Sequence, residues 1–237
     1  MVKYKDLFID FDDTLYDTHG NAVIALEETF EDYRLDRYFS DSQVFYDAYW
    51  AANIDLWGRY SRGEITRDYL IVERFRRPLS EGVGLDITAA YCLEMSDHFL
   101  DHCASKPGVL PGAHELMDHL RQRGYRMHMT SNGFHEVQYK KLAACGLRPY
   151  FDTVILSEDA GANKPSLQFF EYALRQSGAE VATTLMIGDN LQTDIFGAMT
   201  AGLDTLLFNR WSVTPAAYRE QPPTYVVDSL FEIMNLL

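Results

Sequence analysis

The sequence has few of the residues that mark secreted, zinc-bound or membrane-spanning chains. Only three of its 237 residues are cysteine. None has C-x-x-C spacing, so neither a disulfide framework nor a zinc site is expected. No apolar run approaches the length of a membrane span. Residues 1–4 lead directly into the first apolar stretch, which leaves no room for a signal peptide. We therefore expect a cytoplasmic protein without a membrane partner.

Positive charge is also scarce. Lys and Arg number 21 against 35 Asp and Glu, which gives a net charge of −14. Such a chain repels nucleic-acid polymers and anionic membranes, so neither is an expected partner. A phosphate-bearing substrate would have to be bound by local cations. Hydrophobic residues make up 47% of the chain, enough for a substantial core and too many for a disordered protein. The sequence does not indicate an oligomeric state.

The middle of the chain shows no strand-like pattern, and residues 16–105 contain no lysine. Its apolar residues have helical periodicity, and a turn-rich stretch at residues 106–112 ends it. We predict an all-α insertion at 16–106, with 1–15 and 107–237 forming the core domain. Helices are expected at residues 22–32, 44–60, 67–76 and 88–102, with Asp41, Ser42, Thr66 and Thr88 as candidate N-caps.

The rest of the chain alternates regularly between short apolar strands and helices. Helices are expected at 113–123, 135–145, 167–177 and 194–201, each followed by a glycine that stops it. Helices separated by single apolar strands predict an α/β fold with a doubly wound parallel sheet. Gly197 lies inside the last of these helices, where it disfavours the helix, so we expect close packing of that helix on the sheet.

Two carboxylates stand two residues apart at the end of the first predicted strand. Asp10 and Asp12 follow the apolar residues 7–9. Phosphoryl transfer through an aspartyl phosphate needs such a pair: one carboxylate attacks phosphorus, and the other handles the proton of the leaving oxygen. Taken alone, the pattern also fits an ordinary turn or a helix cap.

Polar residues follow three further predicted strands. Parallel strands bring their carboxyl ends to one edge of a sheet, where open α/β folds bind ligands. We therefore expect side chains from distant parts of the chain to converge there. The candidates are Asp10, Asp12, Ser131, Lys164, Asp189 and Asp194.

This ordered set resembles the four motifs of the haloacid dehalogenase superfamily, namely D-x-D-x-T, Ser or Thr, Lys, and G-D-x4-D. The resemblance covers the whole chain. It implies a Rossmann-like core with an all-α cap domain inserted after the first strand. Several phrases are more particularly similar to the capped nucleotide 5′-monophosphatases, or pyrimidine nucleotidases: Gly63-Glu64-Ile65-Thr66, Leu110-Pro111-Gly112-Ala113, Ser131-Asn132-Gly133-Phe134, Lys164-Pro165-Ser166 and Asp194-Ile195-Phe196-Gly197.

The resemblance implies a Mg²⁺-dependent phosphoric monoester hydrolase. Asp10 would be the nucleophile, and Asp12 the general acid and then the general base. Asp189 and Asp194 would hold Mg²⁺ together with Asp10 and the backbone carbonyl of Asp12. Asp194 could equally orient the metal ligands or cap a helix.

The remaining site residues would contact the phosphoryl group. Ser131 and the backbone amides around Asn132 and Gly133 would bind its oxygens at a strand-to-helix junction. Lys164 would offset the charges of Asp10 and of the transferring group. Thr14 is expected to support the loop.

Related chemistries fit less well. A hydrolytic dehalogenase needs no proton donor and typically lacks an acid at the position of Asp12. A phosphonoacetaldehyde hydrolase requires a cap lysine, and a β-phosphoglucomutase has a histidine where this chain has Ala22. We expect a small phosphomonoester, with a nucleoside 5′-monophosphate favoured because the insertion is aromatic and free of lysine. A sugar phosphate, phosphoglycolate, or a catalytically silent ligand-binding regulator remain alternatives.

Six aromatic residues of the insertion could stack on a base, although helical spacing predicts that most of them form its core. They are Phe45, Tyr46, Tyr49, Trp50, Trp57 and Tyr60.

Overall fold

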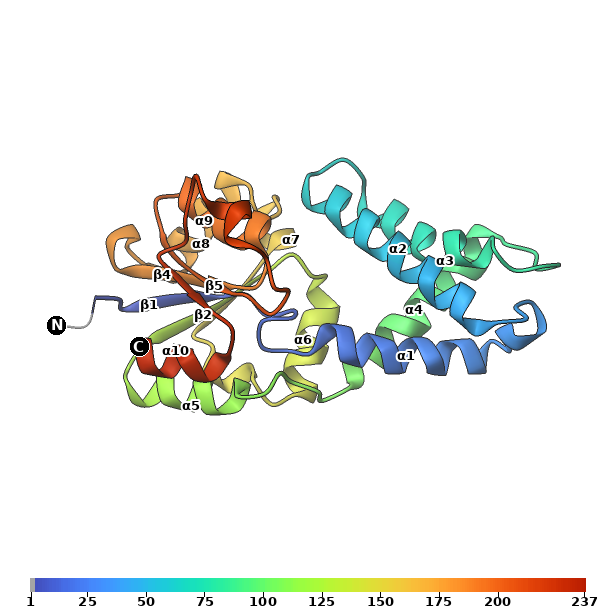
Figure 1. Cartoon of the computed structure of the whole chain (residues 1–237), viewed down its shortest axis with the longest axis horizontal. Coiled ribbons are helices and arrows are strands. Elements are labelled where there is room, and N and C mark those ends of the chain that lie inside the picture. Colours follow the sequence, from blue (N-terminus) through green and yellow to red (C-terminus); the bar gives the residue numbers. More distant parts are fainter. Residues whose placement is uncertain (1–2) are drawn as a thin grey trace. The chain divides into compact units, whose positions relative to one another are not determined.

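The computed structural model describes residues 3–237, so residues 1 and 2 lie outside the described part. The chain divides into two compact units (Figure 1). The core unit contains the described residues up to Thr18 together with Pro107–Leu237, and the helical unit is His19–Lys106. The sequence placed the first junction after residue 15, whereas the core unit continues to Thr18.

Among residues 3–237, six parallel strands form one sheet in the order β3-β2-β1-β4-β5-β6 (Figure 1). From β1 the chain builds outward to β2 and β3, then returns to the other side of β1 for β4, β5 and β6. Open α/β sheets bind ligands at such reversals of strand order. The strands are β1 (Asp6–Ile9), β2 (Arg126–Ser131), β3 (Thr153–Leu156), β4 (Thr184–Gly188), β5 (Asp204–Phe208) and β6 (Tyr225–Val227).

Successive side chains of a strand point to opposite faces of the sheet, and all four residues of β1 are buried, so helices cover both faces. Leu7 and Ile9 pack with side chains of α5, α6 and α10. Phe8 packs with side chains of α7, α8 and α9. Figure 1 shows α5 and α10 on one side and α8 and α9 on the other, which confirms the doubly wound α/β fold. These helices are α5 (Ala113–Gln122), α6 (His135–Ala144), α7 (Ser157–Ala160), α8 (Leu167–Ser177), α9 (Gly197–Thr200) and α10 (Leu230–Leu236).

The helical unit contains helices but no strand within its residues 19–106, as the sequence predicted. Asp41, Thr66 and Thr88 accept hydrogen bonds from backbone amides two or three residues ahead, so these three N-caps are confirmed. Ser42 is instead the first residue of a helix. The helices are α1 (Thr18–Asp32), α2 (Ser42–Ser61), α3 (Arg67–Leu79) and α4 (Ala89–Ser105).

The aromatic residues of the insertion mostly form the core of the helical unit. Phe45 and Tyr49 are fully buried in its apolar cluster. Tyr46 and Trp50 are partly buried and pack against the cluster. Trp57 and Tyr60 are partly buried and make an edge-to-face pair with ring centroids 5.6 Å apart.

The helix predicted at residues 194–201 was wrong in its start and its form. A π-helical segment covers Leu191–Phe196, and its N-cap is Asn190, whose side chain accepts from the Gln192 and Thr193 amides. Asp194 therefore lies inside the helical segment rather than at its opening, because Asn190 supplies a better cap. The α-helix α9 begins directly after this segment, at Gly197.

Close packing occurs at Gly197, but not against the sheet as predicted. A Cβ atom on Gly197 would lie 2.7 Å from the ring of Phe170 and 2.8 Å from the Cα of Pro165. The glycine therefore allows α9 to approach α8 and the turn that carries Lys164.

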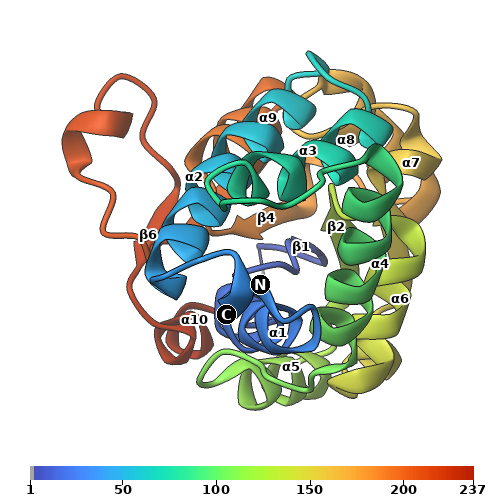
Figure 2. The same cartoon turned by 90° about the vertical axis from the view of Figure 1, so that its right-hand side faces the viewer.

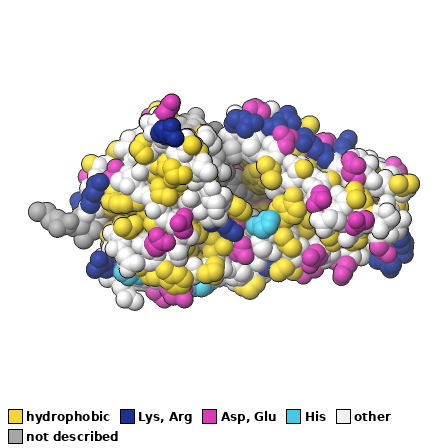
Figure 3. Space-filling model, viewed as in Figure 1, with side chains coloured by type: hydrophobic (Ala, Val, Ile, Leu, Met, Phe, Trp, Pro, Cys, Tyr) yellow, Lys and Arg dark blue, Asp and Glu magenta, His cyan; other side chains and the backbone are white. Residues whose placement is uncertain are grey.

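No helix among the described residues is both long enough and apolar enough to cross a membrane. On the face drawn in Figure 3, several Lys and Arg side chains lie close together along the upper edge of the helical unit, and acidic side chains are spread over the rest of the view.

Candidate active site

The predicted carboxylates meet at the carboxyl ends of neighbouring strands. Asp10 follows β1, and Asp189 follows β4, which pairs directly with β1. Asp194 comes from the π-helical segment behind Asp189. All three are buried, and each offers an oxygen within 4.8 Å of the others. The convergence expected of these three residues is therefore present.

Lys164 lies among these carboxylates. Its Nζ atom donates to Oδ1 of Asp10 at 2.7 Å, to Oδ1 of Asp194 at 2.7 Å and to the Thr130 carbonyl at 2.9 Å. The side chain is 2% exposed. An ammonium group has three protons, so these contacts use its full donor capacity. Lys164 is an internal cation and not a surface turn residue.

The charges in this cluster are unbalanced. Burial raises the pKa of Asp10 well above its usual range, with Lys164 opposing the rise and Asp194 adding to it. Burial and the nearby Asp194 raise the pKa of Asp189 to about 7. Burial alone would lower the pKa of Lys164, but Asp10 and Asp194 raise it above its usual value. Three carboxylates facing one ammonium favour the binding of a further cation.

Thr14 connects two of the carboxylates. Its hydroxyl lies 2.9 Å from Oδ2 of Asp10 and 3.3 Å from Oδ1 of Asp189, and it accepts the Asp189 amide at 3.1 Å. The predicted support of the loop thus includes direct contact with the site. The single hydroxyl proton serves one carboxylate at a time, so the other oxygen keeps a lone pair available for a cation.

Both oxygens of Asp194 already have donors within the protein. Oδ1 accepts from Lys164, and Oδ2 accepts from the Asn190 amide at 3.1 Å. A Cβ atom on Gly188 would lie 2.6 Å from Cγ of Asp194, so glycine is needed for this close approach. These contacts favour Asp194 as a residue that orients Lys164 and its neighbours.

The side chain of Asp12 lies outside the three-carboxylate cluster and has its own partners. Oδ1 accepts from Thr18 at 2.6 Å and from Lys141 at 2.5 Å. Oδ2 accepts from Gln138 and lies 3.5 Å from the Ser131 hydroxyl. Burial would raise the pKa of Asp12, but Lys141 and the hydrogen bonds hold it below its usual value.

Sequence reasoning missed Lys141 and Gln138. The available signal was their spacing of three residues on α6, directly after the Ser131 segment, which places both on one helix face.

Asn132 lies where predicted, but its side chain is engaged. Its amide group bonds both the backbone N–H and the backbone carbonyl of Lys164, at 2.8 and 2.9 Å. The Ser131 hydroxyl accepts the Gly133 amide at 3.0 Å. A phosphoryl contact at Asn132 would therefore come from its backbone N–H, while its side chain fixes the turn of Lys164.

A long segment between β5 and β6 also reaches the site. It is drawn in orange-red beside β6 in Figure 2 and includes a short 3-10 helix, Pro215–Tyr218. Trp211 donates through Nε1 to Oδ2 of Asp189 at 2.5 Å. Arg210 bonds the carbonyl and carboxylate of Asp13, whose φ of 60° is unusual for a non-glycine residue. The Arg210 contacts span 197 positions and the Trp211 contact spans 22, so no local sequence signal indicated them.

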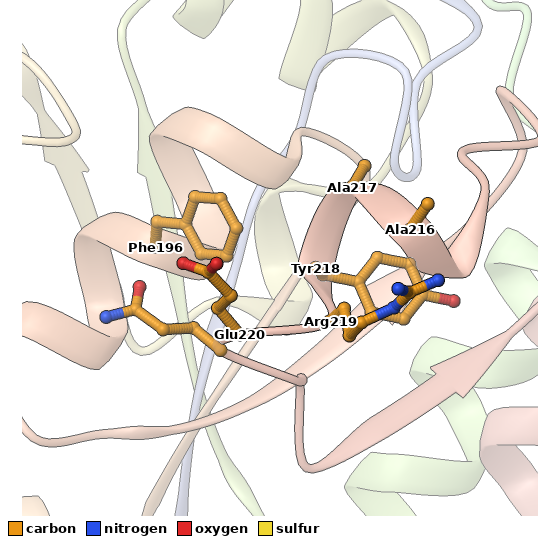
Figure 4. A pocket seen from close by; sticks show the side chains of 7 residues that line it. Phe196, Ala216, Ala217, Tyr218, Arg219 and Glu220 are labelled. Carbon is orange, nitrogen blue, oxygen red and sulfur yellow. The ribbon is translucent and has the colours of Figure 1, made fainter.

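A surface pocket of the core unit lies apart from this chemistry (Figure 4). None of the predicted site residues lines it, so it is not the candidate active site. Its lining residues are Phe196, Ala216, Ala217, Tyr218, Arg219, Glu220 and Gln221.

Comparisons with known proteins agree with this architecture. A family model described as haloacid dehalogenase-like hydrolase matches residues 4–202. Pyrimidine 5′-nucleotidase YjjG of Escherichia coli is 34% identical over 241 residues, covering 100% of this chain and 99% of the relative. Pyrimidine 5′-nucleotidase PynA of Streptococcus pneumoniae is 32% identical, with 99% and 95% covered. The structure of HAD-hydrolase YfnB from Bacillus subtilis, bound to magnesium, has a TM-score of 0.87, 30% identity and 99% coverage of both chains.

Proposed function

Because the chain belongs to the haloacid dehalogenase-like hydrolases, we propose that it is a Mg²⁺-dependent phosphatase that hydrolyses nucleoside 5′-monophosphates through an aspartyl phosphate. One observation carries the proposal. A buried carboxylate, Asp10, lies at the end of the central strand between Lys164 and two further carboxylates, with Asp12 two residues away. The hydrolase class predicted from the sequence is confirmed by the family match.

Asp10 is the proposed nucleophile. Lys164 and Thr14 each hold one of its oxygens, so the carboxylate has a fixed orientation. An oxygen of Asp10 attacks phosphorus, the bond from phosphorus to the ester oxygen breaks, and an aspartyl phosphate forms. Lys164 offsets the negative charge of Asp10 and of the arriving phosphoryl group.

The carboxylate cluster fits Mg²⁺. Asp10, Asp189 and the backbone carbonyl of Asp12 would hold the ion, since Mg²⁺ prefers a few hard oxygen ligands and keeps several waters. The raised pKa values of Asp10 and Asp189 support this assignment, because they indicate negative charge that Lys164 does not neutralise. When bound, the ion reduces the repulsion between Asp10 and a phosphate anion.

Asp12 is the proposed proton carrier. It is ionised in the substrate-free chain, and an arriving phosphate anion opposes this ionisation, so a proton is taken up with the substrate. Asp12 then protonates the leaving ester oxygen. Its regenerated carboxylate accepts a proton from the water that attacks phosphorus in the aspartyl phosphate, which restores Asp10 and releases phosphate.

The nucleotide substrate is supported by two observations. Trp57 and Tyr60 offer aromatic surface in the helical unit outside its buried cluster, and stacking on a base contributes about 1–3 kcal/mol. The two nucleotidase relatives point to the same substrate class.

The test is a hydrolysis assay of the purified protein with Mg²⁺. We expect dUMP to be hydrolysed with a higher kcat/KM than ribose 5-phosphate or phosphoglycolate, and excess chelator to abolish turnover of all three. A preference for ribose 5-phosphate would reject the nucleotide assignment and leave the phosphatase. No turnover of any phosphomonoester would favour the ligand-binding regulator instead.

A further inference from the structure

We propose that Lys141 and Gln138 are positioning residues that hold the carboxylate of Asp12 so that its Oδ2 atom transfers the proton. This inference rests on the proposed function, in which Asp12 is the proton carrier. Neither residue belongs to the four motifs that the sequence revealed.

Both side chains are buried and directed at Asp12. Lys141 is 5% exposed and Gln138 1% exposed. A buried ammonium is unfavourable unless it is paired, and Lys141 pairs with Oδ1 of Asp12 at 2.5 Å. Its Nζ atom also lies 5.1 Å from the ring centroid of Tyr16. The position of Lys141 is therefore fixed by its ion pair and by the aromatic ring.

The contacts distinguish the two oxygens of Asp12. Oδ1 receives Thr18 and Lys141, which together use both of its lone pairs. Oδ2 receives Gln138 and faces the Ser131 hydroxyl at the longer distance of 3.5 Å. Ser131 ends β2, where the phosphoryl group is proposed to bind. Oδ2, whose second contact is the longer one, is therefore the oxygen that faces the proposed phosphoryl position.

Gly133 makes this arrangement possible. A Cβ atom built on Gly133 would collide with the side-chain amide of Gln138. Any larger residue would push Gln138 away from Asp12. The glycine between β2 and α6 is therefore part of the same positioning device.

The experiment compares two leaving groups. An alkyl phosphate such as dUMP needs its leaving oxygen protonated, whereas p-nitrophenyl phosphate does not. In Lys141→Met we expect kcat/KM to fall for both substrates, and the loss for dUMP to exceed the loss for p-nitrophenyl phosphate by about 10-fold or more. The reason is that a small misplacement of a catalytic group slows the step that the group catalyses. Lys141→Arg should recover part of the difference. Lys140→Met is the matched control, since Lys140 is exposed on the same helix and should leave both rates unchanged.

A second variant is used in case Lys141→Met does not fold, and a double variant tests whether Lys141 acts through Asp12. Gln138→Leu should show the same selective loss, and it decides the matter if Lys141→Met does not fold. In an Asp12→Asn background, Lys141→Met should cause little further change in the ratio of kcat/KM for dUMP to kcat/KM for p-nitrophenyl phosphate, because the carboxylate that Lys141 holds is gone. Equal losses for both substrates, or the same additional loss in the Asp12→Asn background, would overturn the inference. A wild type that hydrolyses neither substrate would instead remove the proposed function, and this inference with it.

We infer a second site from an independent observation: Asp32, His98 and His102 form a binding site for a divalent transition-metal ion in the helical unit. Each offers a ligand atom, and these atoms lie within 4.8 Å of one another. His98 and His102 are four residues apart on α4, so they share a helix face, and their ring centroids are 4.1 Å apart. The site contains no cysteine, so cysteine spacing gave no sign of it.

The carboxylates of α1 complete the site. Asp32 contacts Nε2 of His98 at 3.0 Å, and Glu28 contacts Nδ1 of His102 at 2.9 Å. Glu28 is also bound by Lys106 at 2.7 Å, so it acts as the carboxylate that orients a histidine and not as a ligand. Two imidazoles with one carboxylate suit Zn²⁺ or Ni²⁺ better than Mg²⁺.

The test is calorimetric titration of the full chain with Zn²⁺ in excess Mg²⁺, which competes with Zn²⁺ for the core carboxylates. We expect one Zn²⁺ per chain, with affinity reduced roughly 10-fold or more in His98→Gln and in His102→Gln. His114→Gln is the matched control, because His114 is exposed on α5 in the other unit. Absence of Zn²⁺ binding, or equal affinity in all variants, would overturn the site.

Discussion

Replacing Lys164 with methionine tests how strongly the active-site charges depend on one another. The ammonium makes three hydrogen bonds of 2.7, 2.7 and 2.9 Å and is almost fully buried. Removing one partner of a buried ion pair destabilises a protein by about 3–5 kcal/mol, because the remaining charge is left uncompensated. Here two carboxylates, Asp10 and Asp194, lose their cation.

The loss should depend on pH. Without Lys164, the pKa of Asp10 rises further above its value in the unfolded chain. The folded state then holds a proton that the unfolded state has lost, so the variant loses stability as pH rises. We expect a loss of about 3 kcal/mol near pH 7.5, and a loss smaller by at least about 1 kcal/mol near pH 5.

Urea unfolding followed by circular dichroism, in the presence of chelator, measures both values. Lys140→Met serves as the exposed control, with an expected change within about 0.5 kcal/mol. Adding Asp194→Asn to Lys164→Met should restore part of the stability, since it removes one unpaired charge. A loss below about 1 kcal/mol at the higher pH, or the same loss at both, would refute this account of the cluster.

Three further outcomes follow from the proposed function. Asp189→Asn should raise the Mg²⁺ concentration needed for half-maximal activity, because it removes an ionised ligand; an unchanged requirement would contradict its role. The pKa of Asp189 is about 7, above its usual value of 3.8, so the metal-free chain should lose thermal stability as pH rises from about 4 to about 7. Asp189→Asn should lose less stability over the same pH range, and an equal dependence of Tm on pH in the two proteins would refute the raised pKa. Trp57→Ala should raise KM for dUMP by roughly 5-fold to 150-fold while leaving that for ribose 5-phosphate unchanged, and equal effects on both would exclude base stacking.

The sequence predicted the elements whose signals are local. The apolar residues of β1 followed by Asp10, and those of β4 followed by Asp189, are visible in a few adjacent positions. Their convergence follows from the parallel sheet, because all carboxyl ends share one edge. The fold class and the three-carboxylate cluster could therefore be predicted before the structure was known.

Other features depend on contacts between distant segments. Trp211 reaches Asp189 from the connection between β5 and β6, and nothing in its neighbours indicates that. The same holds for Lys141, whose partner Asp12 lies 129 residues away. Asn190 displaced the predicted helix start because its side chain competes as an N-cap, which helical periodicity does not report.

The central claim is that Asp10 forms a covalent bond with phosphorus. The direct measurement is acid quenching during turnover of dUMP, borohydride reduction of the quenched protein, and mass spectrometry of the peptide that contains residue 10. Reduction converts an aspartyl phosphate to homoserine, so the account predicts homoserine at residue 10 in the wild type and none in Asp10→Asn. It also predicts more homoserine at residue 10 in Asp12→Asn than in the wild type when hydrolysis of the aspartyl phosphate slows more than its formation. Homoserine at a different aspartate, or turnover of Asp10→Asn within about 10-fold of the wild type, would contradict the claim.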